Sequence, residues 1–202
     1  LVTTVNRHQT RHFQRPTAPH SSAAFERILS AIAHKPQPLV LDSFCGTGRS
    51  TATLARIHPQ HLVIGVDQSA HRLNKHQADS NTPENYLLLQ ANCEDIWHLL
   101  IQHHLYLDFH YLLYPNPWPK AAHLQRRVHG HGSFPWLLEL GGVIELRSNW
   151  HTYVEEFSIA MQLSGRDGCV SQISGNPAIT LFEQKYRDSG HALWCFKSTP
   201  LK

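Results

Sequence analysis

The length, composition and charge of this chain exclude several classes of protein. Its 202 residues, 41% of them hydrophobic, suffice for one well-buried domain, and no stretch approaches the roughly 20 consecutive apolar residues of a membrane-spanning helix, so we expect a soluble, cytoplasmic protein with no membrane partner. The net charge of +3 permits a polyanionic partner without requiring one, and the four cysteines, which form no CxxC pair, argue against a zinc knuckle or a disulfide framework and are expected to be reduced and mostly buried.

A basic N-terminal arm is expected over residues 1–20. Its charged and titratable side chains follow no clear period; they are Arg7, His8, Arg11, His12 and Arg15. Two interpretations stay open: the arm is a disordered tail, or it contacts RNA through its positive charge. The remaining residues, 21–202, are expected to form a single domain, which begins with a helix capped by Ser21 and Ser22 and running to about His34.

Strands and helices are then expected to alternate along the chain. Apolar runs typical of strands occur at 39–44, 62–66, 86–89, 107–113, 143–146, 169–173 and 191–196, and amphipathic segments typical of helices occur at 49–58, 69–79, 94–104, 121–140 and 150–163. This alternation predicts an α/β, Rossmann-like fold with a seven-stranded, mostly parallel sheet and helices on both faces. No clear long helix separates the last two strands, so we expect them to pair as a C-terminal antiparallel hairpin.

A glycine-containing turn follows the first predicted strand, within residues 42–51. Gly46 and Gly48 would let the backbone approach a ligand closely, and the helix that follows adds amide donors. The spacing is not GxGxxG, and no Lys-Ser or Lys-Thr pair follows, so a nucleoside triphosphate is not expected. A turn without any ligand is the alternative.

Acidic and amide side chains end the next two predicted strands. Asp67 closes the second strand, where a carboxylate is placed to accept hydrogen bonds from the two hydroxyls of an adenosyl ribose. Asn92 and Glu94 follow the third strand and would flank an adenine ring. Alternatively, Asn92 is simply the N-cap of a helix whose first turn carries acids.

A rigid turn, Tyr114-Pro-Asn-Pro-Trp-Pro-Lys120, ends the fourth predicted strand. Its three prolines fix the backbone and remove three amide donors, so the chain must leave the sheet here. The turn would hold Asn116 and Trp118 at the rim, beside the basic side chains of Arg126 and Arg127, which suits a flat, anionic substrate. The alternative is an ordinary proline turn with Trp118 in the core.

Five strands thus deliver polar or glycine-rich ends to one rim of the predicted sheet, the fifth ending in Arg147-Ser-Asn149-Trp150. A nicotinamide cofactor would call for GxGxxG. An acid before the glycine turn, Asp42, together with Asp67, instead suits S-adenosylmethionine, whose amino and sulfonium groups are cationic. The sequence therefore favours S-adenosylmethionine as the cofactor.

Three blocks of residues carry a resemblance to a known family. The proline turn with His123 and Arg126-Arg127, the segment 147–150 with Tyr153, and Thr180-Leu-Phe-Glu183 with Gly190-His191 are similar, in order and spacing, to the bacterial tRNA (guanine-N7-)-methyltransferases. The resemblance covers roughly residues 36 to 196. It implies an enzyme that transfers the methyl group of S-adenosylmethionine to N7 of a guanine in tRNA.

The resemblance also implies roles for single residues. Asp42, Asp67 and Glu94 would line the cofactor site, and Asn116 stands where the family has an aspartate considered catalytic. Lys120 and Asn149 would face the substrate, and the segment from Thr180 to Glu183 would hold the guanosine. The chain departs from the family at three positions: Phe44 replaces the first glycine of the loop, and Asn116 and Asn149 replace common aspartates.

These departures leave two further interpretations open, a related methyltransferase with another acceptor and an RNA-binding paralogue with weak or no turnover. We expect tRNA as the partner of this protein. We also expect the protein to be a monomer or a homodimer. The histidines lack an HExxH pattern or mixed cysteine and histidine spacing, so no metal site is expected.

Overall fold

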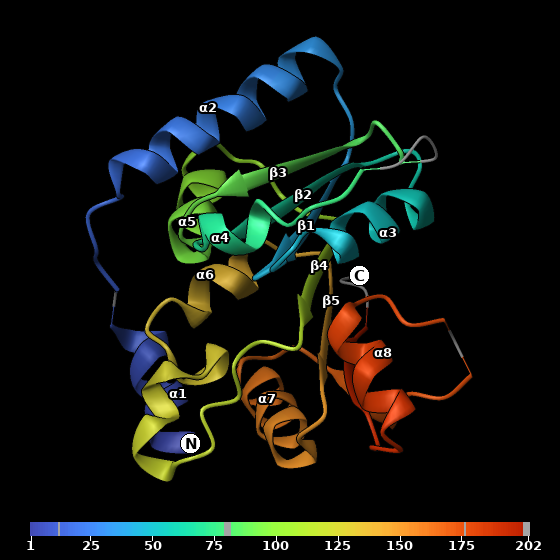
Figure 1. Cartoon of the computed structure of the whole chain (residues 1–202). Coiled ribbons are helices and arrows are strands. Elements are labelled where there is room, and N and C mark those ends of the chain that lie inside the picture. The colour runs from blue at the N-terminus through green and yellow to red at the C-terminus, as the bar shows by residue number, and fades with distance from the viewer. Residues whose placement is uncertain (12, 79–81, 176, 200–202) are drawn as a thin grey trace.

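A seven-stranded sheet lies at the centre of the molecule (Figure 1). The computed structural model describes residues 1–11, 13–78, 82–175 and 177–199. The strands are β1 (Leu39–Ser43), β2 (Leu62–Asp67), β3 (Tyr86–Gln90), β4 (Phe109–Leu113), β5 (Val143–Ser148), β6 (Gly168–Gln172) and β7 (Trp194–Ser198).

The strand order is β3-β2-β1-β4-β5-β7-β6. The first five strands along the chain run parallel, and β7 lies antiparallel between β5 and β6. β1 and β2 are buried along their whole length because helices cover both faces of the sheet. The predicted fold class is confirmed, including the antiparallel C-terminal pair.

Helices form a layer on each face of this sheet. They are α1 (Val2–Thr10), α2 (Pro19–His34), α3 (Arg49–Ile57), α4 (Ala70–Leu73), α5 (Cys93–Gln102), α6 (Phe134–Glu139), α7 (His151–Leu163) and α8 (Leu181–Asp188), with two 3-10 helices, η1 (Ala121–Arg126) and η2 (Val128–Gly130). The larger core lies under α2, α5 and α7. On the other face, Leu54 and Ala55 of α3 pack with Ile179, which precedes α8, so α3 and the start of α8 cover this face together.

The expected helix at 121–140 is wrong as a single element. The chain forms η1, η2 and the short helix α6 there instead. Gly130 is one reason, since a Cβ at this position would lie 2.0 Å from the carbonyl oxygen of Leu124, so the chain folds back on itself more tightly than one straight helix allows. Pro135 then sits in the first turn of α6.

Two other helix predictions also change. The helix expected at 69–79 is only the four-residue α4, after which the chain turns so that the His76 ring reaches the carbonyl oxygen of Thr47, 3.0 Å away. Residue 79 lies outside the described residues. Conversely, the segment expected to lack a clear helix before β7 holds α8, which Thr180 caps by accepting a hydrogen bond from the Glu183 amide at 2.9 Å.

The N-terminal arm is not a disordered tail. Residues 2–10 form α1, which packs on α7 and places Val5 in the core, and Arg15 forms a 2.6 Å ion pair with Asp95 at the start of α5. His12 lies outside the described residues. Helix α2 begins at Pro19, with Ala18 rather than Ser21 or Ser22 as its N-cap, so the boundary expected after residue 20 falls inside this helix.

No helix in the described ranges is long and apolar enough to span a membrane. All four cysteines are free thiols. Cys45 and Cys93 are buried as expected, whereas Cys195 is half-buried and Cys169 is exposed. The expectation that most of them are buried therefore holds for two of the four.

Candidate active site

A cavity of about 330 Å³ opens at the carboxyl ends of β1 to β4. It lies at the edge of the sheet where the polar ends of the strands were predicted to meet. Residues from five connecting segments line it: Phe44 after β1, Gln68 and Arg72 after β2, Asn92, Cys93, Glu94 and Trp97 after β3, Tyr114, Pro115, Asn116 and Trp118 after β4, and Arg126, Val128, His131 and Ser133 beyond them. The cavity is thus assembled by the topology of the parallel strands.

The glycine turn after β1 adopts a left-handed backbone conformation at several positions, and of its residues Phe44 lines the cavity whereas Gly46 and Gly48 do not. Gly46 and Gly48 have φ values of 61° and 77°, and a Cβ on Gly48 would lie 2.5 Å from a methyl carbon of Leu88. Phe44 also has a positive φ, 63°, which is strained for a residue with a side chain. Its ring lines the cavity and meets the Trp97 ring edge-on, with 6.2 Å between centroids.

Asp67 ties the end of β2 to the glycine turn. One carboxylate oxygen accepts a 3.0 Å hydrogen bond from the Gly46 amide, and the other accepts one of 2.8 Å from the Ser69 amide and pairs with Arg72 at 3.1 Å. The side chain is only 1% exposed. Asp67 therefore holds the turn in place from behind, and any ribose contact would be made from this position.

Asp42 lies deeper, below the same turn. Its Oδ2 accepts hydrogen bonds of 2.7 Å from the hydroxyls of Ser50 and Thr51, while its Oδ1 has no partner within the described residues. Burial raises the pKa of Asp42 from its usual 3.8 to about 6, against the opposite effect of the two hydroxyls, and the nearby Asp67 charge raises it further. Asp42 does not line the cavity.

Because the pKa of Asp42 is raised, we expect the stability of the fold to depend on pH. The unfolded chain loses this proton near pH 3.8 and the folded chain near pH 6, so the free energy of unfolding falls across that window, by up to about 3 kcal/mol. Asp42→Asn removes this loss. We expect denaturant unfolding to show the variant gaining stability relative to the wild type between pH 4 and pH 7. The exposed Asp108→Asn serves as the control, and an equal gain there would contradict the assignment.

Asn92 and Glu94 both line the cavity at the start of α5. Asn92 occupies the N-cap position, but its side chain does not cap the helix: Nδ2 donates a 3.0 Å hydrogen bond to Asp95 instead. Asp95, in turn, has its pKa lowered by hydrogen bonds from Asn92 and Arg15 that outweigh the effect of burial. The Asp95 carboxylate is thus occupied by hydrogen bonds within the protein, and Glu94 is the carboxylate that lines the cavity.

The proline turn after β4 is held from below by Arg127. The guanidinium donates hydrogen bonds to the carbonyl oxygens of Trp118 and Pro119, at 3.2 and 3.3 Å, and forms an ion pair with Glu156. Arg127 is only 4% exposed. The structure therefore does not place Arg127 at the substrate surface, where the sequence analysis expected it.

Asn116 is exposed at the tip of this turn. Its Oδ1 accepts a 3.3 Å hydrogen bond from the Trp118 amide, and Trp118 has a positive φ of 46°. Trp118 lines the cavity and carries the Arg126 guanidinium 4.9 Å from its ring centroid, so the alternative in which Trp118 fills the core is wrong. The turn presents Asn116, Trp118 and Arg126 to one opening.

A family model described as "Putative methyltransferase" matches residues 36–196, most of the chain. This chain belongs to that methyltransferase family. The protein of Salmonella typhimurium called tRNA (guanine-N(7)-)-methyltransferase is 27% identical to it over 78% of this chain and 70% of its own length. The protein of the same name from Nitrosospira multiformis is 28% identical, over 82% of this chain and 76% of its own.

Solved structures of other methyltransferases share the fold. The 16S rRNA methyltransferase KamB superposes with a TM-score of 0.60 at 15% identity, covering 95% of this chain and 99% of its own. A variant of the 16S rRNA (adenine(1408)-N(1))-methyltransferase of Catenulisporales acidiphilia, solved with its cosubstrate SAM, gives 0.57 at 15% identity, covering 88% and 91%. At this identity the likeness concerns the fold alone.

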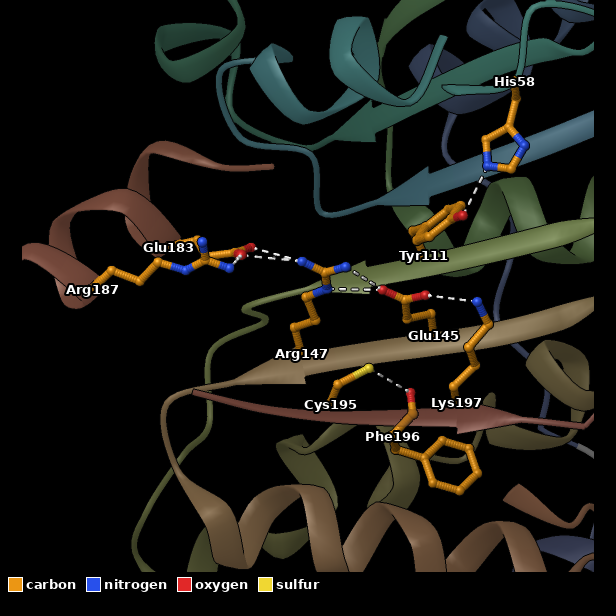
Figure 2. Close-up of polar contacts among 9 residues, drawn as sticks. All are labelled: His58, Tyr111, Glu145, Arg147, Glu183, Arg187, Cys195, Phe196 and Lys197. Atoms are coloured by element: carbon orange, nitrogen blue, oxygen red, sulfur yellow. Dashed lines mark hydrogen bonds and ion pairs between the residues drawn. The ribbon is translucent and has the colours of Figure 1, made fainter. Parts of the chain in front are cut away.

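The remaining predicted residues of this methyltransferase lie away from the cavity. Lys120 is exposed beyond it and Asn149 is half-buried after β5. Glu183 is fully buried and binds Arg147 at 3.1 Å and Arg187 at 2.7 Å (Figure 2). Thr180 and Glu183 therefore shape the start of α8, and neither lines the cavity.

The ion pairs of Glu183 belong to a longer chain of charges in the methyltransferase. Arg147 also binds Glu145 at 2.7 Å, and Glu145 lies 3.6 Å from the ammonium of Lys197 (Figure 2). The two carboxylates raise the pKa of Arg147 despite its burial, so this guanidinium stays charged. The network fastens α8 to β5 and β7.

Sequence reasoning missed several residues that line the methyltransferase cavity. The polar ones are Gln68, Arg72, Tyr114, His131 and Ser133. Burial and the nearby Glu183 carboxylate raise the pKa of the Tyr114 hydroxyl, which keeps it neutral. Tyr114 adjoins the proline turn, so its place beside Asn116 could have been predicted, whereas Arg72 and His131 lie in segments that were expected to be ordinary helices.

No group of three or more His, Cys, Asp or Glu side chains within the described ranges could hold a metal ion. His110 is an example of a histidine that is buried and hydrogen-bonded within the protein. It lies in β4, and its Nε2 meets the Ser43 hydroxyl at 2.9 Å. Burial lowers the pKa of His110 to about 3, so the ring is neutral at physiological pH.

Proposed function

We propose that this protein transfers the methyl group of S-adenosylmethionine to N7 of a guanine in tRNA. The observation that carries the proposal is the single cavity onto which the Phe44 segment, Glu94 and the Asn116 turn all open. The chain is also similar over 78% to 82% of its length to proteins called tRNA (guanine-N(7)-)-methyltransferase. The family supplies the reaction class, and these relatives support the choice of acceptor.

The residues present fit S-adenosylmethionine. The space beside Gly46 is open, with no atom within 4 Å of a Cβ placed there, so the backbone could approach a ligand closely. The Glu94 carboxylate at the cavity suits a cationic cofactor, and Asp42 and Asp67 add negative charge behind the wall. In the proposal, Gly46, Gly48, Asp67 and Asn92 complete the cofactor site. When bound, the cofactor supplies an electrophilic methyl group on sulfur.

The chain's own part in the reaction is alignment. N7 of guanine carries a lone pair and no proton, so methyl transfer needs no general base. Asn116 keeps a second lone pair on Oδ1, which can accept a hydrogen bond from the guanine amine or the cofactor's ammonium group. In the proposal, Asn116 thus orients the two reactants, although as a neutral amide it brings no negative charge.

The substrate side is proposed from exposed cations. Arg126, at the end of η1, lines the cavity, and Lys120 ends the proline turn just before η1; both are exposed. Their positive charge suits tRNA phosphates. Asn149, just after β5, and Thr180, the N-cap of α8, would contact the tRNA outside the cavity, whereas Glu183 would act only by positioning α8, because its carboxylate is fully buried.

The proposal is tested by incubating the full chain with labelled S-adenosylmethionine and unmodified tRNA, followed by nucleoside analysis. We expect label in 7-methylguanosine. Label in another nucleoside would instead support a second candidate, a related methyltransferase with a different acceptor, which the amides Asn116 and Asn149 favour because they replace two carboxylates of the substrate side. No labelled nucleoside at all would overturn both and support an RNA-binding paralogue.

Replacing Asn116 by aspartate should raise this activity. A charge-assisted hydrogen bond contributes about 1.5–3 kcal/mol, against about 1 kcal/mol for a neutral one, so kcat/KM for guanine-N7 methylation should rise about tenfold. Steady-state kinetics with tRNA measure this change. The control, Asn116→Leu, has a similar volume and no acceptor, and it should lower kcat/KM. Unchanged or lower activity of Asn116→Asp would speak against a guanine contact at this position.

A further inference from the structure

A second, larger hollow of about 810 Å³ lies on the α3 face of the molecule. Two arginines and one lysine line it, and no aspartate or glutamate is among the lining residues that the structure describes. The charged and polar groups that matter are Arg49, Thr53, Arg56, Lys75 and His76. We call this hollow the basic groove.

The basic groove lies next to the cavity of the proposed active site. Leu181, the first residue of α8, lines the groove. The next residue, Phe182, packs its ring 4.8 Å from that of Tyr114, which lines the cavity. Only the first turn of α8 therefore separates the two hollows, and Figure 1 shows α3 and α8 on the same side of the molecule.

The groove also shares a wall with the glycine turn. Thr47, between Gly46 and Gly48, lines the groove. Its carbonyl oxygen can only accept, so His76 Nδ1 donates the 3.0 Å hydrogen bond between them, and Nε2 then accepts a 2.8 Å bond from the Tyr86 hydroxyl. A ligand in the groove would thus lie against the same turn whose glycines we propose to contact the cofactor.

The cations are spaced for an extended anion. Arg49 and Arg56 lie on α3 two turns apart, about 10.5 Å along the helix axis, which is too far to serve one phosphate group. Arg49 and Lys75 are exposed and form no ion pair with any residue in the described ranges, so their charges are available to a ligand. Guanidinium and ammonium groups that line one groove at separate positions suit more than one phosphate of a nucleic-acid backbone.

We propose that the basic groove binds the phosphate backbone of the tRNA whose guanine enters the neighbouring cavity. This inference rests on the proposed function for the identity of the RNA. It goes beyond that function by naming a second contact surface, formed by α3 and residues 75–78, that the resemblance to the tRNA methyltransferases did not suggest. The backbone would cross the first turn of α8, with the base on one side and the phosphates on the other.

The test is a double variant, Arg49→Gln with Lys75→Gln, measured for binding of an unmodified tRNA transcript by fluorescence anisotropy over a range of salt concentrations. At about 0.1 M salt we expect Kd to rise about tenfold, and the slope of log K against log salt to become shallower by about 1.5–2, as for two lost phosphate contacts. The matched control, Arg27→Gln with Lys35→Gln, removes two positive charges from α2 and its end, and it should change Kd less than twofold.

Two further measurements keep this inference separate from the proposed function. Cofactor affinity, measured with S-adenosylhomocysteine by calorimetry, and the thermal transition should stay at wild-type values in the double variant, since neither residue lines the cavity. If the wild type makes no 7-methylguanosine, the proposed function fails, while the salt titration still decides whether the groove binds RNA. A wild-type Kd and salt slope in the double variant, or an equal loss in the α2 control, would overturn the inference.

Discussion

Replacing Glu183 by glutamine is expected to lower the free energy of unfolding by about 3 kcal/mol. The carboxylate is fully buried and neutralises Arg147 and Arg187, at 3.1 and 2.7 Å. Glutamine keeps one acceptor but turns an amide NH₂ toward two guanidinium groups, and removing one partner of a buried ion pair costs about 3–5 kcal/mol. The lower end applies because Arg147 keeps Glu145 as a partner and Arg187 is 24% exposed.

Thermal and denaturant unfolding of the Glu183→Gln variant measure this loss. For a chain of this size, about 3 kcal/mol corresponds to a fall in Tm of about 6–12 °C. The control is Asp188→Asn on the same helix, which removes an equal charge from an exposed site and should change stability by less than about 0.5 kcal/mol. A Glu183→Gln variant that melts with the wild type would show that the network does not hold α8.

The same variant separates two roles of Glu183. A residue that contacts guanosine would affect KM for tRNA without changing stability. A residue that only positions α8 should change both together, since Phe182 and Leu181 lie on the helix that it fastens. Because Glu183 has no exposed surface, we expect both the KM for tRNA and the stability to change in this variant.

The fold could be predicted because its signals are local and periodic. Apolar runs separated by amphipathic segments identified all seven strands and their mostly parallel arrangement. The rim site followed from topology, since the ends of parallel strands converge at one edge of the sheet. That is why Asn92, Glu94 and Asn116 were all expected there and all line one cavity.

What could not be predicted depends on partners that are distant in sequence. Arg127 looks like Arg126 in the sequence, but Glu156, 29 residues later, captures it below the turn. The basic arm appeared aperiodic, yet Asp95 pairs with its Arg15. An isolated charge gives no sign of whether it will meet a counter-charge or solvent, so these two assignments needed the structure.

Backbone strain could not be predicted from the sequence either. Phe44, Tyr114 and Trp118 all have positive φ values, of 63°, 56° and 46°, and all three line the cavity. Such residues commonly lie at functional sites, where the surrounding structure compensates for the strain. The sequence showed only that Phe44 replaces a glycine, and the structure explains the glycine preference of this position through its left-handed conformation.

Replacing Asp67 by alanine is expected to lower the affinity for S-adenosylhomocysteine about 100-fold. The carboxylate accepts hydrogen bonds from Gly46 and Ser69 and pairs with Arg72, so alanine releases the glycine turn and leaves the Arg72 charge free at the cavity. Two charge-assisted hydrogen bonds contribute about 1.5–3 kcal/mol each. A loss of about 3 kcal/mol of binding free energy, from the released glycine turn and any lost ribose contact, corresponds to a Kd about 100-fold higher.

Calorimetry with S-adenosylhomocysteine measures the change, and circular dichroism checks that the Asp67→Ala variant is folded. Asp67→Asn should be intermediate, because its amide oxygen can still accept from Gly46 while its NH₂ opposes the Ser69 amide. Asp108→Ala removes an exposed carboxylate just before β4, at the amino end of the sheet, and should leave the affinity within twofold. If Asp67→Ala binds as tightly as the wild type, the cofactor does not depend on the glycine turn that Asp67 fixes.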